Sequence, residues 1–226
     1  MTLQLISGRR WWRPLLALIL ASALCCAYIV FRAWYAREIS FKGFIWNLFL
    51  AWVPLGFAIV LHVRRELKLR FSWPDLGAVI LWLLFFPNAP YIVTDLVHLH
   101  PRPGVPYWYD IIGIMAFAMT GLFLGYLSLY LVQEVVSDYC GRVTGWFFAL
   151  AMLALSSFGI YLGRFLRWNS WDALLTPFST IKDAVKVANP LSNPTAAAFS
   201  ATFFGFALVC YLIVYSFTHL ERRPRE

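Results

Sequence analysis

The decisive stretch is PDLGAVILWLLFFPNAPYIVTDLVH, residues 74–98. It begins with an apolar run suited to a lipid environment and continues with residues that are unfavourable in lipid. Residues 76–86 carry no polar side chain. The segment that follows holds two prolines, an amide, a carboxylate and an imidazole: Pro87, Pro90, Asn88, Asp95 and His98. A membrane span tolerates prolines and ionisable groups only where protein or trapped water satisfies them, so an intramembrane Asp or His is a candidate functional residue. The stretch predicts a membrane-spanning segment that carries a functional site.

The whole composition agrees with a membrane protein. Of 226 residues, 61% are hydrophobic and 13% are charged, and the mean hydropathy is +0.68, outside the range of ordinary soluble domains. Apolar windows long enough to cross about 30 Å of hydrocarbon lie at about 14–33, 43–63, 74–97, 109–132, 145–166 and 195–218. We therefore expect an all-α integral membrane protein with six spans, forming a single polytopic domain over residues 1–226.

Basic residues lie in short loops at the ends of the spans, so the net charge of +8 sets orientation and does not indicate nucleic acid. The side that holds the N-terminus carries 11 Lys and Arg residues and the other side 8. We expect both termini in the cytoplasm. Arg9, Arg10 and Arg13 before the first span would also suit a cleaved signal peptide, but its apolar run from Leu15 to Phe31 exceeds a signal core and favours an uncleaved anchor.

In the third span, Pro87 and Pro90 predict a break close to the bilayer centre. Proline disfavours helical geometry at the residue before it, so Phe86 and Ala89 are expected to be extended, with Asn88 capping a second half-helix. Free amides and a positive helix end inside the membrane would then suit an anionic group. Alternatively, the span ends near Phe86 and the rest forms a pocket at the outer leaflet.

Helical spacing from Tyr91 onward places Tyr91, Asp95 and His98 on one face. The Asp95 carboxylate could orient the His98 imidazole as a proton carrier, or the two could hold a metal. The metal alternative is weak, because the paired-His spacing of a zinc helix is absent. Asp110 follows in the next loop and extends the candidate site.

The predicted end of span five reaches the same side of the membrane with a second polar group: Tyr161, Arg164, Arg167, Asn169 and Asp172. An arginine fork matches carboxylate or phosphate, so Arg164 and Arg167 could bind an anionic ligand or a lipid headgroup, with Asn88, Tyr91, Asp110, Asn169 and Asp172 completing the site. The alternative is internal pairing of the arginines with Asp95, Asp110 or Asp172. Both can hold at once.

Other patterns in the sequence concern helix packing and the longest loop. Three pairs of small residues four positions apart predict close helix packing: Gly121 and Gly125, Gly159 and Gly163, Ala201 and Gly205. Thr180 and Asp183 have capping-box spacing, which predicts a short interfacial helix at about 179–188. The four cysteines show no paired spacing. Without a nucleotide, phosphate-loop or metal motif, we expect neither a cofactor nor ATP coupling.

Residues 86–98, FPNAPYIVTDLVH, resemble the motif of a bacterial family of multi-pass membrane proteins known only as a domain of unknown function. Residues 162–172, LGRFLRWNSWD, support the resemblance. It implies a multi-pass protein of a bacterial inner membrane and supplies no activity.

Three functions follow from these residues. The first is binding or transport of a small anionic or lipid-headgroup ligand through a polar site open to the extracytoplasmic face. The second is an enzyme that acts on a membrane-embedded substrate, with Asp95 and His98 as an acid–base pair. The third is a structural subunit, which predicts no cavity and every charge paired. The bilayer is the expected partner; the sequence leaves the oligomeric state open.

Overall fold

A computed structural model describes residues 12–38, 41–70, 72–101, 104–168, 175, 177–189 and 193–219, where the regular structure is helical. The elements are α2 (Trp12–Ala36), α3 (Lys42–Glu66), α4 (Trp73–Phe85), α5 (Asn88–Tyr91), the 3-10 helix η1 (Ile92–His98), α6 (Tyr107–Cys140), α7 (Arg142–Phe165), α9 (Pro177–Ala188) and α10 (Pro194–His219). Six segments are long and apolar enough to cross a membrane: α2, α3, α4 through η1, α6, α7 and α10. They confirm the predicted all-α class with six spans.

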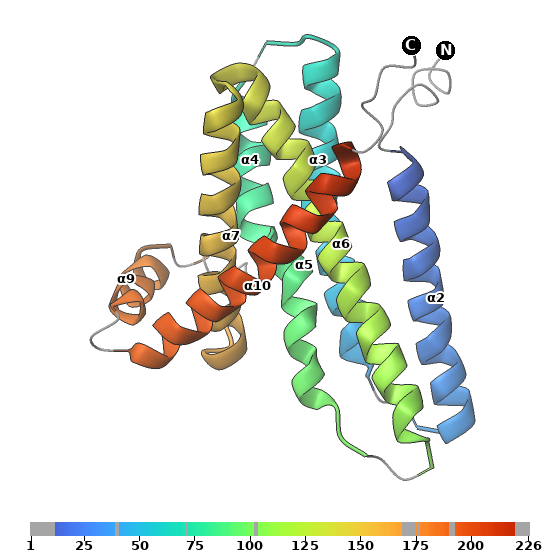
Figure 1. Ribbon diagram of the computed structural model, residues 1–226. Helices are drawn as coiled ribbons and strands as arrows, with labels where there is room; N and C mark the ends of the chain where they lie inside the picture. Colours follow the sequence, from blue (N-terminus) through green and yellow to red (C-terminus); the bar gives the residue numbers. More distant parts are fainter. Residues whose placement is uncertain are drawn as a thin grey trace.

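Successive spans run in opposite directions (Figure 1). The beginning of α2 and the end of α10 therefore lie at one end of the bundle, and η1 lies toward the other, with the end of α7 and the beginning of α10 (Figure 1). Helix α9 forms where residues 179–188 predict a short helix, and it projects beside the bundle near the start of α10. Its position at a membrane surface stays a prediction.

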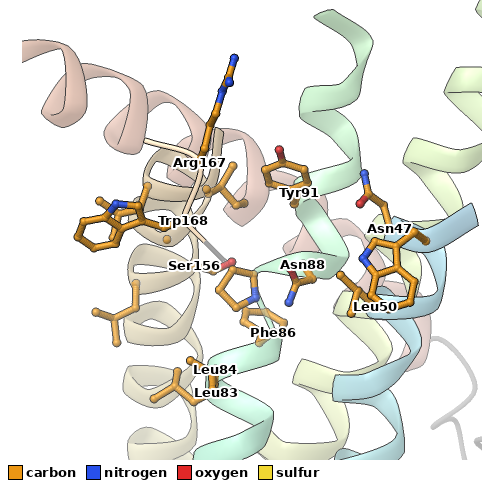
Figure 2. Close-up of a pocket in the computed structure, with 17 residues that line it drawn as sticks. Asn47, Leu50, Leu83, Leu84, Phe86, Asn88, Tyr91, Ser156, Arg167 and Trp168 are labelled. Carbon is orange, nitrogen blue, oxygen red and sulfur yellow. The ribbon is translucent and has the colours of Figure 1, made fainter. Parts of the chain in front are cut away.

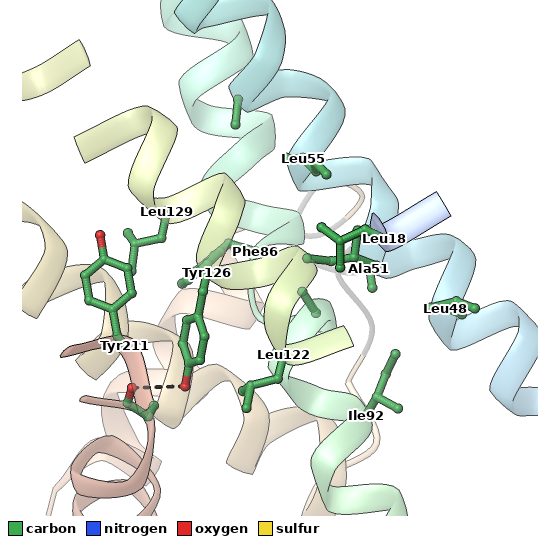
Figure 3. Close-up of a cluster of buried hydrophobic side chains, with 14 of the residues drawn as sticks. Leu18, Leu48, Ala51, Leu55, Phe86, Ile92, Leu122, Tyr126, Leu129 and Tyr211 are labelled. Carbon is green, nitrogen blue, oxygen red and sulfur yellow. Dashed lines mark hydrogen bonds between the residues drawn. The ribbon is translucent and has the colours of Figure 1, made fainter. Parts of the chain in front are cut away.

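The core is built around α6, the most buried span. Its apolar residues Leu122, Leu124 and Leu129 are at most 3% exposed. Tyr126 donates a hydrogen bond of 3.0 Å to the carbonyl of Ala207 in α10 (Figure 3). A buried phenol needs such a partner. The bond therefore links α10 to α6, although few other residues of α10 are buried.

Glycines let α6 and α7 approach α5 closely. A Cβ at Gly121 of α6 would lie 2.7 Å from the carbonyl oxygen of Ala89, and one at Gly159 of α7 would lie 3.2 Å from Cγ of Pro87. Gly125 and Gly163 make similar approaches. Two of the predicted small-residue pairs are therefore confirmed as packing positions. Nothing lies within 4 Å of a Cβ at Gly205, so Gly205 of the third pair makes no such approach to the described residues.

The third span departs from its prediction. Phe86 has φ −54° and ψ −41°, and Ala89 lies inside helix α5, so the expected extended conformations are wrong. The α-helix of α4 ends at Phe85 and 3-10 geometry follows from Ile92, but the predicted break into half-helices is not confirmed. Phe86 is 1% exposed and stacks on Trp82 at 4.9 Å. This packing offsets the preference of a residue before proline for extended geometry.

Asn88 also differs from its predicted role as a helix cap. Pro87 occupies the N-cap position of α5, and Asn88 Nδ2 donates a hydrogen bond of 3.1 Å to the carbonyl of Phe85. That carbonyl belongs to the last residue of α4, where acceptors lack α-helical donors. Asn88 therefore stabilises the junction of α4 with α5.

Candidate functional site

Arg164 of α7 joins the fifth span to the third. Its Nη1 lies 3.0 Å from Oδ1 of Asp95 and 3.3 Å from the hydroxyl of Tyr91. Its Nη2 donates to the carbonyl of Thr94 at 2.9 Å and contacts Nε2 of His98 at 3.2 Å. Four residues of one helical face thus bind a single guanidinium, and the predicted internal pairing of Arg164 with Asp95 is confirmed.

Asp95 is 3% exposed, and α3 supplies its second partner. Asn47 Nδ2 donates to Oδ2 of Asp95 at 2.8 Å, while Oδ1 faces Arg164. A buried charge is tolerated when it is paired and hydrogen-bonded, and this carboxylate has both. We name the residues that meet here the ion-pair cluster: Asn47, Tyr91, Thr94, Asp95, His98 and Arg164.

The contact between Arg164 and His98 has one possible direction as a hydrogen bond. Arginine has no acceptor atom, so Nη2 of Arg164 would donate and Nε2 of His98 would accept. Among the described residues no hydrogen bond joins Asp95 to His98, because Arg164 binds both. Asp95 and His98 therefore meet through Arg164, and their role as an acid–base pair stays a prediction.

A cavity of about 510 Å³ lies next to the ion-pair cluster, between α3, the α4–α5 junction and α7 (Figure 2). Apolar residues make most of its wall, among them Leu50, Leu83, Leu84, Leu155 and Ile160. The polar residues of the wall are Asn47, Asn88, Tyr91, Ser156 and Arg167. The cavity is thus an apolar space with a few polar groups, which is the usual composition of a ligand pocket.

Arg167 and Trp168 lie at the end of the cavity beyond α7 (Figure 2). Arg167 adopts a left-handed φ of 58°, which turns the chain just after the helix, and its side chain is exposed. In the described part of the chain its guanidinium has no hydrogen-bond or ion-pair partner. The two arginines predicted to act together are therefore separated: Arg164 is bound to span three, and Arg167 follows α7 with its side chain pointing away from Asn88 and Ser156 (Figure 2).

The structure places Asp110 in a different group. It is 1% exposed at the first turn of α6, where Nε and Nη2 of Arg32 donate to its two oxygens at 2.7 and 2.9 Å. The hydroxyl of Tyr28 adds a bond of 3.0 Å. Asp110 is therefore engaged with α2, and its contacts in the described chain do not include the ion-pair cluster. Asn169 and Asp172 lie outside the described residues.

The sequence did not predict two residues of this site, Asn47 and Ser156. Asn47 is the only Asn, Gln, Asp or Glu in the predicted second span, and an isolated amide in an apolar window is a signal of the same kind as Asp95. Ser156 gave no signal, because serine is common in membrane helices. It is 3% exposed, and its Oγ has no hydrogen-bond partner in the described structure.

Within the described ranges, no group of three or more His, Cys, Asp or Glu residues is arranged to hold a metal ion. The four cysteines, Cys25, Cys26, Cys140 and Cys210, are free thiols.

The fold and the site define a multi-pass membrane protein, with six apolar segments among the described residues and a cavity beside a buried ion pair. A family model described as "Protein of unknown function (DUF1361)" matches residues 46–213. Because this match covers most of the chain, the chain belongs to that family. No curated protein and no solved structure matches it.

Proposed function

We propose that this protein binds an amphipathic membrane lipid with an anionic headgroup, taking the apolar chain into the cavity and the headgroup at its mouth. The observation that carries the proposal is the cavity of about 510 Å³, which falls within the range of about 300–1,000 Å³ usual for ligand sites. A bundle whose charges only held helices together would need no such space.

The position of the cavity suits a ligand that arrives from the bilayer. Three residues of its wall, Trp46, Leu83 and Leu155, are 53%, 37% and 52% exposed. All three lie inside membrane-spanning segments, where an exposed apolar side chain faces lipid. An entrance bordered by such residues admits an acyl chain without passage through water.

The charge at the mouth suits an anion. The charge of Arg164 is compensated by Asp95 at 3.0 Å, whereas Arg167 has no partner in the described chain. Tyr91 accepts from Arg164 through its hydroxyl oxygen, so its O–H remains a donor at the cavity wall. An arginine and a phenol at the membrane interface are suitable donors for phosphate.

With this function we also propose the orientation that the basic residues predict, with both termini in the cytoplasm of a bacterial cell. Arg167 and the cavity mouth then open toward the outer leaflet of the inner membrane, where the headgroup would lie. Binding is the proposed activity, and the ion-pair cluster serves to hold the cavity wall together.

The test is ligand-induced stabilisation in a neutral detergent. A ligand that binds the folded state raises the unfolding midpoint in proportion to occupancy. We expect phosphatidylglycerol to raise the midpoint of the wild type more than phosphatidylcholine does, and Arg167→Gln to lose most of the difference. Arg37→Gln is the matched control, because Arg37 is an exposed arginine at the end of α2, away from the cavity. Equal effects of both lipids on the wild type would contradict the proposal.

A further inference from the structure

Ser156 is one of four described residues with a buried side-chain nitrogen or oxygen that has no hydrogen-bond partner, and of the four it is the one that lines the cavity. It lies in the wall of the cavity, near Asn88 (Figure 2), and its hydroxyl is buried without a hydrogen-bond partner. Native proteins satisfy nearly all buried polar groups, so an exception inside a ligand-sized cavity points to a partner from outside the chain.

The neighbouring serine shows the usual arrangement. Ser157 is 1% exposed, and its Oγ donates to the carbonyl of Leu153 at 2.7 Å. This is the ordinary bond of a serine to the residue four positions earlier in a membrane helix. Ser157 does not line the large cavity. The two serines thus differ in partner and in access to the cavity, although they have the same chemistry and depth.

We propose that Ser156 donates a hydrogen bond to an acyl-ester carbonyl of the bound lipid, which identifies the ligand as an ester-linked phospholipid. This inference rests on the proposed function. The hydroxyl supplies an unused donor, and an ester carbonyl in an apolar cavity is an acceptor that has lost its water. The Oγ of Ser156 has almost no accessible surface in the described structure, so donation to the ligand requires the side chain to turn to another staggered χ1 rotamer.

The spacing along α7 agrees with such a ligand. Ser156 lies nine residues before the end of α7 at Phe165, a rise of about 14 Å, and the flexible side chain of Arg167 can reach back over part of that length. Gly159 and Gly163 lie between them on the cavity wall, where α7 packs closely on Pro87 and Tyr91. One face of α7 therefore offers a donor at depth and a cation at the mouth, in the order ester and phosphate.

The experiment compares two lipids on three proteins. The lipids are ester-linked phosphatidylglycerol and its ether-linked analogue with the same chains, and the proteins are the wild type, Ser156→Ala and Ser157→Ala. Affinities are measured in detergent by titration. A neutral hydrogen bond corresponds to about threefold to tenfold in affinity. We expect the wild type and Ser157→Ala to prefer the ester lipid by that factor, and Ser156→Ala to bind both lipids equally.

An ester preference that is the same in the wild type and in Ser156→Ala would overturn the inference, as would no preference in the wild type. Either result leaves the proposed function intact if both anionic lipids still bind better than phosphatidylcholine. If no anionic lipid bound, both the proposed function and this inference would be wrong. Because the hydroxyl has no partner in the described protein, Ser156→Ala is expected to keep its unfolding midpoint, which guards against loss of binding through misfolding.

Discussion

Asp95 and Arg164 form the ion pair that ties the fifth span to the third. Removing one member of a buried pair leaves the other charge uncompensated, at a cost of about 3–5 kcal/mol. We expect Asp95→Asn and Arg164→Gln each to lower the unfolding midpoint clearly. The double variant should lose much less than the sum, because each single change already breaks the same interaction. Strictly additive losses in a double-mutant cycle would show that the pair is not formed.

Asp110 provides a contrast at the same scale. Its carboxylate binds Arg32, whose side chain is 2% exposed, so Asp110→Asn is expected to destabilise the protein by a similar amount. It should leave the preference of the folded protein for anionic lipid unchanged, because Asp110 is absent from the cavity wall. Lipid titration below the unfolding transition measures this. If a well-folded Asp110→Asn protein lost the preference for anionic lipid, Asp110 would have to be counted among the residues of the ligand site.

At the scale of elements, the packing of α5 between α6 and α7 depends on glycine. A Cβ at Gly121 would lie 2.7 Å from a backbone oxygen, which cannot move aside as a side chain can. We therefore expect Gly121→Ala to destabilise by about 1–3 kcal/mol, the usual cost of overpacking. Gly205→Ala is the control, because the space there is open and alanine favours helix. Denaturant unfolding of both variants should separate them, and equal losses would contradict the packing described.

The same elements show what the sequence could predict. Hydropathy located the six spans, because the length of an apolar run is a property of the sequence alone. Three small-residue pairs share one spacing, yet only Gly121 with Gly125 and Gly159 with Gly163 meet a neighbour, since spacing does not name a partner. Local preference failed at Phe86, where burial against Trp82 outweighs the effect of the following proline.

The candidate site could be predicted only in part. Asp95, Arg164 and Arg167 are recognisable in the sequence because charges are rare in a membrane span. The different positions of the two arginines depend on where α7 ends and turns, which the composition does not give. Ser156 matters because its hydroxyl has no partner among the described residues, and only the packed structure shows that.

At the scale of the whole molecule, the proposed orientation places Cys140 in the cytoplasm. Cys140 is exposed at the end of α6, whereas Cys25, Cys26 and Cys210 lie inside spans. A membrane-impermeant maleimide should label it in inside-out vesicles and leave it unlabelled in intact bacterial cells. His100→Cys in a Cys140→Ser background, at an exposed position beyond η1, should show the reverse. Labelling of Cys140 from outside the cell would invert the topology.

The central claim, that the cavity holds an anionic lipid, is tested most directly by native mass spectrometry. The protein is released from nanodiscs that contain equal amounts of phosphatidylglycerol and phosphatidylcholine. We predict that the wild type and Arg37→Gln each retain a single phosphatidylglycerol molecule, and that Arg167→Gln retains far less. Retention of both lipids in proportion to their abundance, or the same retention by Arg167→Gln as by the wild type, would contradict the account.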